Sequence, residues 1–270
     1  CQTILASGMV VSPGFIDLHC HLREPGFEYK ETIATGTQAA AKGGFTTLCC
    51  MPNTDPPIDN AAVVEFIKRR AQTDAIVRVY PIGCVTKKRF GKELAEMEEL
   101  ASSGVVAFSD DGDPVYDPHL MRLALAYSLD LGIPISNHCQ ELSLSRNGVM
   151  AEGWTATRLG LPGIPAAAEE AMITRDIALV ELTGGRLHLA HLSTAGSVQA
   201  VRRAKDAGLP VTAEVCPHHL TITDNWALGT KGINTSAASV ASYDTSTKVY
   251  PPLRGTSDVD ALVMGLADGV

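Results

Sequence analysis

The residues best suited to chemistry gather in one short stretch near the start of the chain, Pro13–Gly26 (PGFIDLHCHLREPG). An apolar run bounded by Pro-Gly pairs predicts a short buried strand that ends in a loop. Alternate side chains on a strand share a face, so Asp17, His19 and His21 point the same way. Two imidazoles one pleat apart, beside a carboxylate, can hold a metal ion from one rigid element. The structural alternative is a pair of core histidines satisfied by hydrogen bonds.

More His and Asp residues follow other predicted strands, at the point where each strand ends. Asn53 follows the second strand, Asp110 and Asp111 the fourth, His138 the fifth and His191 the sixth. In a barrel of parallel strands, the carboxyl ends open onto one mouth, where reactive groups gather. Histidine and carboxylate ligands without thiolates favour a catalytic zinc-type centre. They suffice for one ion, or for two ions bridged by a hydroxide that attacks amide or ester carbonyls.

The elements that must position these residues alternate between strand and helix. The pattern predicts a first strand within the stretch 13–26, further strands at 45–51, 77–84, 105–108, 133–138, 186–191 and 211–215, and helices at 31–42, 61–73, 92–102, 119–131, 166–183, 194–207 and 257–267. Such strand–helix units favour a parallel sheet with helical crossovers. They predict an α/β fold, a (β/α)8 TIM barrel whose eighth strand is missing from this chain. A doubly wound open sheet is the alternative, but no Gly-rich dinucleotide fingerprint follows the first strand.

Composition narrows the class of protein. The chain has 270 residues, enough for one large α/β domain, and a net charge of −8 with no basic cluster argues against nucleic-acid binding. Its apolar runs are too short for a membrane span. Seven cysteines without a Cys-x-x-Cys pair suit reduced thiols and a cytoplasmic protein. Residues 228–246, rich in Ser, Ala, Thr and Gly, predict a mobile loop. The start at Cys1 and the end at Val270 read like those of a segment of something longer.

Five motifs together resemble bacterial class I dihydroorotase, a member of the amidohydrolase superfamily. They are the stretch 13–26, MPNT at 51–54, FSDDG at 108–112, HLST at 191–194 and PPLR at 251–254. The resemblance runs in order through nearly the whole chain. It implies an enzyme, a zinc-dependent hydrolase that reversibly cyclises N-carbamoyl-L-aspartate to L-dihydroorotate in pyrimidine biosynthesis. Residues 1–270 would then be one incomplete amidohydrolase barrel domain, with 1–13 the remnant of a connection to an N-terminal β-sandwich.

The resemblance also implies a ligand set. His19 and His21 would bind one zinc ion, and His138 and His191 the other. Asp111 would bridge the two ions, at the position where many relatives carry a carboxylated lysine. A hydroxide between the ions would attack the ring amide carbonyl, and a nearby carboxylate would carry the proton to the leaving nitrogen.

Substrate contacts are implied at three further positions. Arg23 and Asn53 match the residues that hold the substrate carboxylate, and a fixed guanidinium fork suits an anionic substrate near an acidic mouth. Tyr250 stands where the family commonly has Asn. A Tyr cannot reproduce the donor and acceptor pair of an amide, so this substrate contact departs from the family pattern. Asp110 is a less favoured stand-in for Asp111, and its alternative role is loop capping.

The family's catalytic aspartate lies in a TDHAPH stretch on strand eight, expected beyond Val270 and absent from this chain. His218 and His219 follow the seventh strand, and we expect them to support other residues rather than to bind metal.

A hydantoinase, dihydropyrimidinase or allantoinase on the same barrel is the enzyme alternative. A non-catalytic partner of aspartate transcarbamoylase is the alternative of another class. The chain could also form a homo-oligomer.

Overall fold

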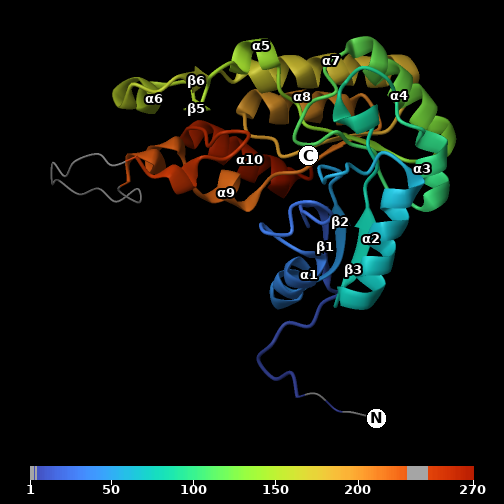
Figure 1. Ribbon diagram of the computed structural model, residues 1–270. Coiled ribbons are helices and arrows are strands. Elements are labelled where there is room, and N and C mark those ends of the chain that lie inside the picture. The colour runs from blue at the N-terminus through green and yellow to red at the C-terminus, as the bar shows by residue number, and fades with distance from the viewer. Residues whose placement is uncertain (1–2, 4, 230–242) are drawn as a thin grey trace.

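The computed structural model describes residues 3, 5–229 and 243–270 (Figure 1). The strands are β1 (Phe15–Cys20), β2 (Phe45–Cys50), β3 (Arg78–Pro81), β4 (Ile135–Asn137), β5 (Met150–Ala151), β6 (Gly163–Ile164), β7 (Leu187–Leu189) and β8 (Val211–Ala213). The helices are α1 (Ile33–Lys42), α2 (Ala61–Asp74), α3 (Met97–Ser103), α4 (Pro118–Leu131), α5 (Leu142–Ser145), α6 (Trp154–Leu159), α7 (Ala167–Thr183), α8 (Ala195–Asp206), α9 (Pro217–Thr221) and α10 (Thr256–Asp268). Three short 3₁₀ helices complete the described chain: η1 (Lys87–Arg89), η2 (Asp224–Leu228) and η3 (Thr245–Thr247). Most of the loop expected at 228–246 lies outside the described residues.

The strands pair in the order in which they occur along the chain. One parallel sheet has the order β1-β2-β3, and a second has the order β4-β7-β8. Phe108 joins them, because it forms parallel bridges to Gly83 on one side and to Ile135 in β4 on the other. The order therefore never reverses, whereas a doubly wound sheet reverses at its switch point. The structure confirms the α/β class and excludes the open-sheet alternative for the described residues.

Helices cover the outside of this curved series of strands. In Figure 1, α1 and α2 lie against β1–β3, and α4, α7 and α8 follow one another along the other half. Local signals set several of the boundaries. The Thr32 side chain accepts the Thr35 N–H in a capping box that begins α1, and the side chain of Thr194 accepts the Ser197 N–H at the start of α8. The second cap matters for the site, because Thr194 is the last residue of the HLST motif.

The core lies between the strands and these helices. Phe108, Ile135, Leu187 and Leu189 come from three neighbouring strand positions, and all are fully buried or nearly so. The outer edge at β1 is different, since Phe15, Ile16 and Leu18 are 59%, 60% and 54% exposed. In the described part of the chain, β1 and β8 each pair with a strand on one side only. An eighth strand that closes the ring between them stays a prediction.

Some predicted elements were wrong in extent. The helix expected over 92–102 begins only at Met97, because the Lys87 N–H pairs with the Glu93 carbonyl and Thr86 pairs with Leu94 in an antiparallel bridge. The strand expected at 105–108 is reduced to the bridges of Phe108. Residues 147–165 contain β5, α6 and β6, which project from the body in Figure 1.

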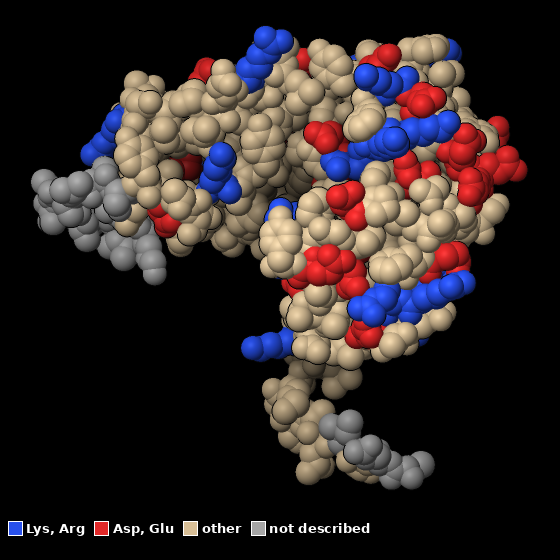
Figure 2. Space-filling model, viewed as in Figure 1, with Lys and Arg blue, Asp and Glu red and all other residues tan. Residues whose placement is uncertain are grey.

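On the face shown in Figure 2, Lys and Arg side chains are interspersed with Asp and Glu, so this face does not indicate a binding surface for a strongly charged partner. None of the described helices is long and apolar enough to cross a membrane. These observations leave the strand ends as the place to look for function.

Candidate metal centre

One carboxylate lies between two pairs of histidines. Asp111 Oδ2 is 3.4 Å from His19 Nε2 and 3.5 Å from His21 Nε2. Its other oxygen, Oδ1, is 3.5 Å from His138 Nδ1 and 3.3 Å from His191 Nε2. Each oxygen thus faces one pair of imidazoles, and the two groups of donors share only Asp111. The structure therefore brings together all five residues that the sequence analysis proposed as ligands.

The convergence follows from the fold. His19 lies in β1, His138 directly follows β4, and His191 follows β7 by two residues. Asp111 comes three residues after the bridge at Phe108, the strand position between the two sheets. Because the strands are parallel, their carboxyl ends meet on one side and deliver these side chains to one place. His191 also has a φ of 36°, a left-handed backbone that is costly for a non-glycine residue and is common at functional sites.

The local electrostatics favour a cation. Burial alone would raise the pKa of Asp111, but hydrogen bonds from His138, His19 and His191 hold that pKa far below its usual range. Burial disfavours the imidazolium of His19, yet its carboxylate partners outweigh this and raise the pKa of His19 to about 10. Burial lowers the pKa of His21 to about 4. The site thus holds a fixed negative charge among imidazoles, and a divalent ion would replace the proton that His19 carries.

The donor set fits such an ion. His138 Nδ1 and His191 Nε2 are only 2.9 Å apart, and both face the same oxygen of Asp111. Two unprotonated imidazole nitrogens this close would repel each other, so the pair needs either a proton or a metal ion between its lone pairs. Four imidazoles and one carboxylate are a ligand set that zinc accepts.

Glu214, which the sequence analysis missed, contacts two of the candidate ligands, His19 and His191. Glu214 Oε1 lies 2.5 Å from His19 Nδ1 and accepts the backbone N–H of His191 at 3.3 Å, while Oε2 lies 3.2 Å from His188 Nε2. A carboxylate on the far nitrogen of a ligand histidine fixes its orientation and tautomer. Glu214 directly follows β8, so an acid at the end of the seventh predicted strand was the available signal.

Asn53 supports the neighbouring histidine. Its Oδ1 lies 3.0 Å from His21 Nδ1, which directs His21 Nε2 toward Asp111. The amide nitrogen of Asn53 remains as its donor. The described residues include no hydrogen-bond partner for the guanidinium of Arg23, which is half-buried beside His21. The role of Arg23 and Asn53 in holding a substrate carboxylate stays a prediction.

Tyr250 and Gln140 lie next to His138. Gln140 Oε1 is 3.2 Å from His138 Nε2, and Gln140 Nε2 donates to the Tyr250 hydroxyl at 2.8 Å. The Tyr250 ring stacks on the His138 ring with an angle of 8° and a centroid distance of 6.2 Å. Tyr250 therefore contacts the metal centre through Gln140 and through stacking, whatever contact it makes with a substrate.

Two neighbouring residues point elsewhere. Asp110 accepts the backbone N–H groups of Val85 and Thr86 and lies 2.5 Å from the Thr86 hydroxyl, so it anchors the segment after β3. The Cys20 thiol donates to the Cys49 carbonyl, away from the histidines on either side of it, as alternation along β1 predicts. All six cysteines that the structure describes are free.

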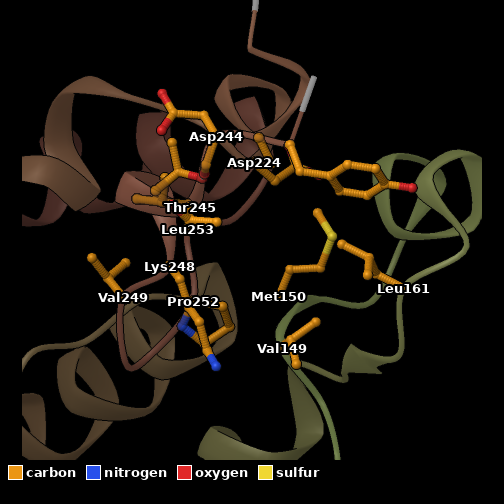
Figure 3. A pocket seen from close by; sticks show the side chains of 13 residues that line it. Val149, Met150, Leu161, Asp224, Asp244, Thr245, Lys248, Val249, Pro252 and Leu253 are labelled. Atoms are coloured by element: carbon orange, nitrogen blue, oxygen red, sulfur yellow. The ribbon is translucent and has the colours of Figure 1, made fainter. Parts of the chain in front are cut away.

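An apolar pocket elsewhere in the described residues is not part of this centre. It has a volume of about 250 Å³ and lies between the segment around β5 and the residues that precede α10 (Figure 3). Met150, Leu161 and Leu253 give it an apolar lining, with Asp224 and Lys248 at its sides. None of the five candidate ligands lines it. The chemistry therefore belongs to the cluster around Asp111.

Comparisons with known proteins agree with this geometry. A family described as dihydro-orotase-like matches residues 8–197. A dihydroorotase from Pelotomaculum thermopropionicum is 56% identical over 99% of this chain and 60% of its own length. One from Caldanaerobacter subterraneus is 52% identical over 98% of this chain and 58% of its own length. The chain thus spans about three fifths of the relatives that it matches.

Solved structures share the fold at lower identity. An L-hydantoinase from Arthrobacter aurescens superimposes with a TM-score of 0.78 at 21% identity, covering 95% of this chain and 56% of that one. A D-hydantoinase from Thermus gives a TM-score of 0.69 at 23% identity. The family match covers more than half of the chain, and the relatives share about half of its residues. The chain therefore belongs to the dihydroorotase-like family.

Proposed function

We propose that this chain supplies the metal-binding part of a dihydroorotase, an enzyme that reversibly closes N-carbamoyl-L-aspartate to L-dihydroorotate in pyrimidine biosynthesis. The observation that carries the proposal is the position of Asp111, with one oxygen toward His19 and His21 and the other toward His138 and His191. This arrangement suits two zinc ions that share one carboxylate. We infer the substrate from the relatives, which are named dihydroorotase.

The residues of the chain have separate tasks in this proposal. When bound, zinc supplies a polarised carbonyl and a hydroxide at neutral pH. Asp111 would keep its negative charge near neutral pH, because hydrogen bonds from the histidines lower its pKa. Glu214 and Asn53 hold His19 and His21 by their Nδ1 atoms, so that both Nε2 atoms face Asp111. Preorganised ligands of this kind spare the enzyme reorganisation during the reaction.

The substrate carboxylate would be bound by Arg23, with the Asn53 amide nitrogen as a second donor. Both residues adjoin His21, so a carboxylate held there would place the ring near the centre. A guanidinium and an amide bind a carboxylate through charge-assisted hydrogen bonds. This anion site is the reason to favour dihydroorotate over hydantoin or allantoin, which lack that carboxylate.

We also propose that an eighth strand closes the ring between β8 and β1 and carries the aspartate that moves the proton. The exposed apolar residues of β1 and its single pairing partner support this proposal. So does the two fifths of the relatives' length that this chain does not span. We further propose a cytoplasmic location, which the free thiols suit, together with a homo-oligomer and a complex with aspartate transcarbamoylase.

The test compares substrates on the purified zinc-loaded protein with the proposed eighth strand present, because that strand would carry the aspartate that moves the proton. We expect ring opening of L-dihydroorotate to be at least a hundredfold faster than that of hydantoin or allantoin, and His19→Ala to lose both metal and turnover. Turnover of the neutral rings alone would instead assign a hydantoinase or allantoinase. Full metal content in His19→Ala would overturn the proposed ligand set. Metal binding without turnover of any ring would favour the non-catalytic alternative.

A further inference from the structure

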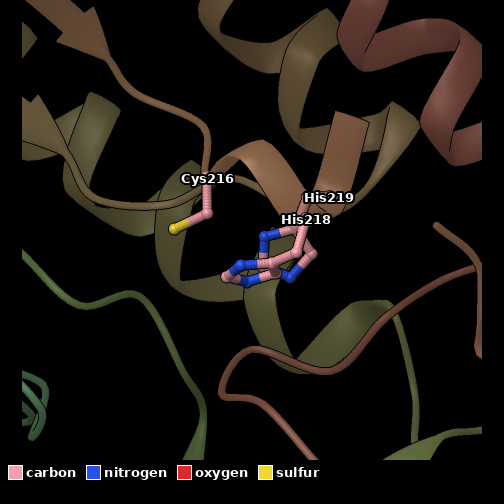
Figure 4. A group of neighbouring side chains, drawn as sticks. All are labelled: Cys216, His218 and His219. Atoms are coloured by element: carbon pink, nitrogen blue, oxygen red, sulfur yellow. The ribbon is translucent and has the colours of Figure 1, made fainter. Parts of the chain in front are cut away.

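A second group of potential ligands lies at the start of α9, directly after β8. Cys216, His218 and His219 each place one possible ligand atom within 4.8 Å of the others. Figure 4 shows their side chains extending from one turn of the chain, with the two imidazole rings close together. The ring centroids of the two histidines are 4.3 Å apart. No residue of this group belongs to the five around Asp111.

His219 carries the observation that points to a ligand. The side chain is buried, and its Nε2 lies 3.0 Å from the backbone carbonyl of Pro251. A carbonyl only accepts hydrogen bonds, so Nε2 carries the proton and Nδ1 has a free lone pair. Nδ1 is fully buried and has no hydrogen-bond partner among the described residues. Leaving such an acceptor unpaired is unfavourable, so it calls for a partner.

The arrangement matches the way in which proteins prepare a metal ligand. A ligand histidine usually donates its other ring N–H to a backbone carbonyl or a carboxylate, which fixes the tautomer. Pro251 plays that part for His219. Burial lowers the pKa of His219 to about 4 and also lowers that of His218, so both imidazoles are neutral and able to bind metal at pH 7. Burial raises the pKa of Cys216 to about 11, so its thiol keeps its proton until a cation displaces it.

We propose that Cys216, His218 and His219 form a metal site of their own, separate from the centre around Asp111. One thiolate and two imidazoles select a zinc-type or softer cation and leave a fourth position for water. Binding breaks the Cys216 S–H bond, forms a sulfur–metal bond and releases one proton to solvent. The carbonyl of Pro251, next to Tyr250, links the site to the segment that leads into α10.

Cobalt(II) gives a test that separates the two sites. Sulfur bound to Co²⁺ produces a charge-transfer absorption in the near ultraviolet, and the centre around Asp111 contains no sulfur ligand. We expect the purified protein to develop this band on titration with Co²⁺, and Cys216→Ser to lose the band and one equivalent of bound metal. His219→Ala should weaken this site at least about tenfold. Circular dichroism establishes that each variant is folded.

Two control variants assign the band. Cys20→Ser removes the thiol between His19 and His21, and Asp111→Asn disables the proposed centre there. Both should keep the band. A protein saturated with Co²⁺ that shows no band, or a band that survives in Cys216→Ser, would overturn the proposal. A failure of the proposed dihydroorotase activity would leave these spectra unchanged, so the two proposals fail separately.

Discussion

Asp110 should stabilise the protein without taking part in its chemistry, although it adjoins the proposed bridging ligand. It is buried and accepts the N–H groups of Val85 at 2.9 Å and Thr86 at 3.1 Å. The substitution Asp110→Ala leaves both donors unpaired, at about 1–3 kcal/mol each. The Thr86 O–H also loses its acceptor, although the hydroxyl oxygen still accepts the N–H of Gly91. We expect a decrease of roughly 3 kcal/mol in the free energy of unfolding at pH 5.

The same residue has a pH dependence whose sign follows from its pKa. Burial outweighs the hydrogen bonds and raises the pKa of Asp110 from 3.8 to about 6. The folded state therefore binds this proton more tightly than the unfolded state. The resulting stabilisation is fully present below pH 3.8 and is lost as the pH rises through 6, by up to about 3 kcal/mol. Asp110→Asn cannot ionise, so its stability relative to the natural protein should increase between pH 5 and pH 7.

Urea unfolding at pH 5 and pH 7, with the dependence on urea concentration compared among variants, measures both effects. Asp110→Asn is the matched control, because its amide oxygen can still accept both N–H groups. It should stay within about 1 kcal/mol of the natural protein at pH 5 and retain its metal. Asp110→Ala with unchanged stability at pH 5 would refute the anchoring role. Loss of metal in Asp110→Asn would show that Asp110, not only Asp111, serves the centre.

Three further outcomes are expected. Glu214→Gln removes the charge beside His19 and should weaken metal binding about tenfold to hundredfold in a chelator competition, and an unchanged affinity would argue against its orienting role. Arg23→Ala should raise KM for dihydroorotate about tenfold to hundredfold and leave hydantoin kinetics unchanged, while equal effects on both rings would argue against carboxylate binding. Tyr250→Phe loses the acceptor of Gln140 and should lower the free energy of unfolding by about 1 kcal/mol, which thermal melting can detect; an unchanged melting temperature would exclude a net stabilising contribution from this contact.

The convergence of the histidines could be predicted because it depends only on where strands end. His19, His138 and His191 lie on strands that run parallel, so any parallel ring carries them to the same side. Asp111 was found the same way, although its strand is reduced to the bridges of Phe108. The sequence pattern thus located the ends of strands better than their lengths.

The supporting residues could not be predicted in this way. Glu214 reaches His19 across the gap between β8 and β1, and the direction of a side chain just after a three-residue strand does not follow from alternation. The late start of α3 has a similar cause. The acidic run before it is typical of a helix, but contacts with Thr86 and Lys87 hold residues 93–94 in an antiparallel pair instead. Contacts between distant segments decide such details, and local propensity does not.

The order of the strands has a consequence for how the protein is made. Within each of the two larger sheets, every strand after the first pairs with a strand that was synthesised before it. Strand pairs can therefore form one after another as the ribosome releases the chain. His19 and His21 emerge with the first strand, whereas His191 emerges 170 residues after His21, and Glu214 emerges 195 residues after His19. A nascent chain therefore presents the group of His19, His21 and Asp111 before the second group is completed by His191. We therefore expect a metal ion shared by both histidine pairs to bind only after His191 has joined the other ligands.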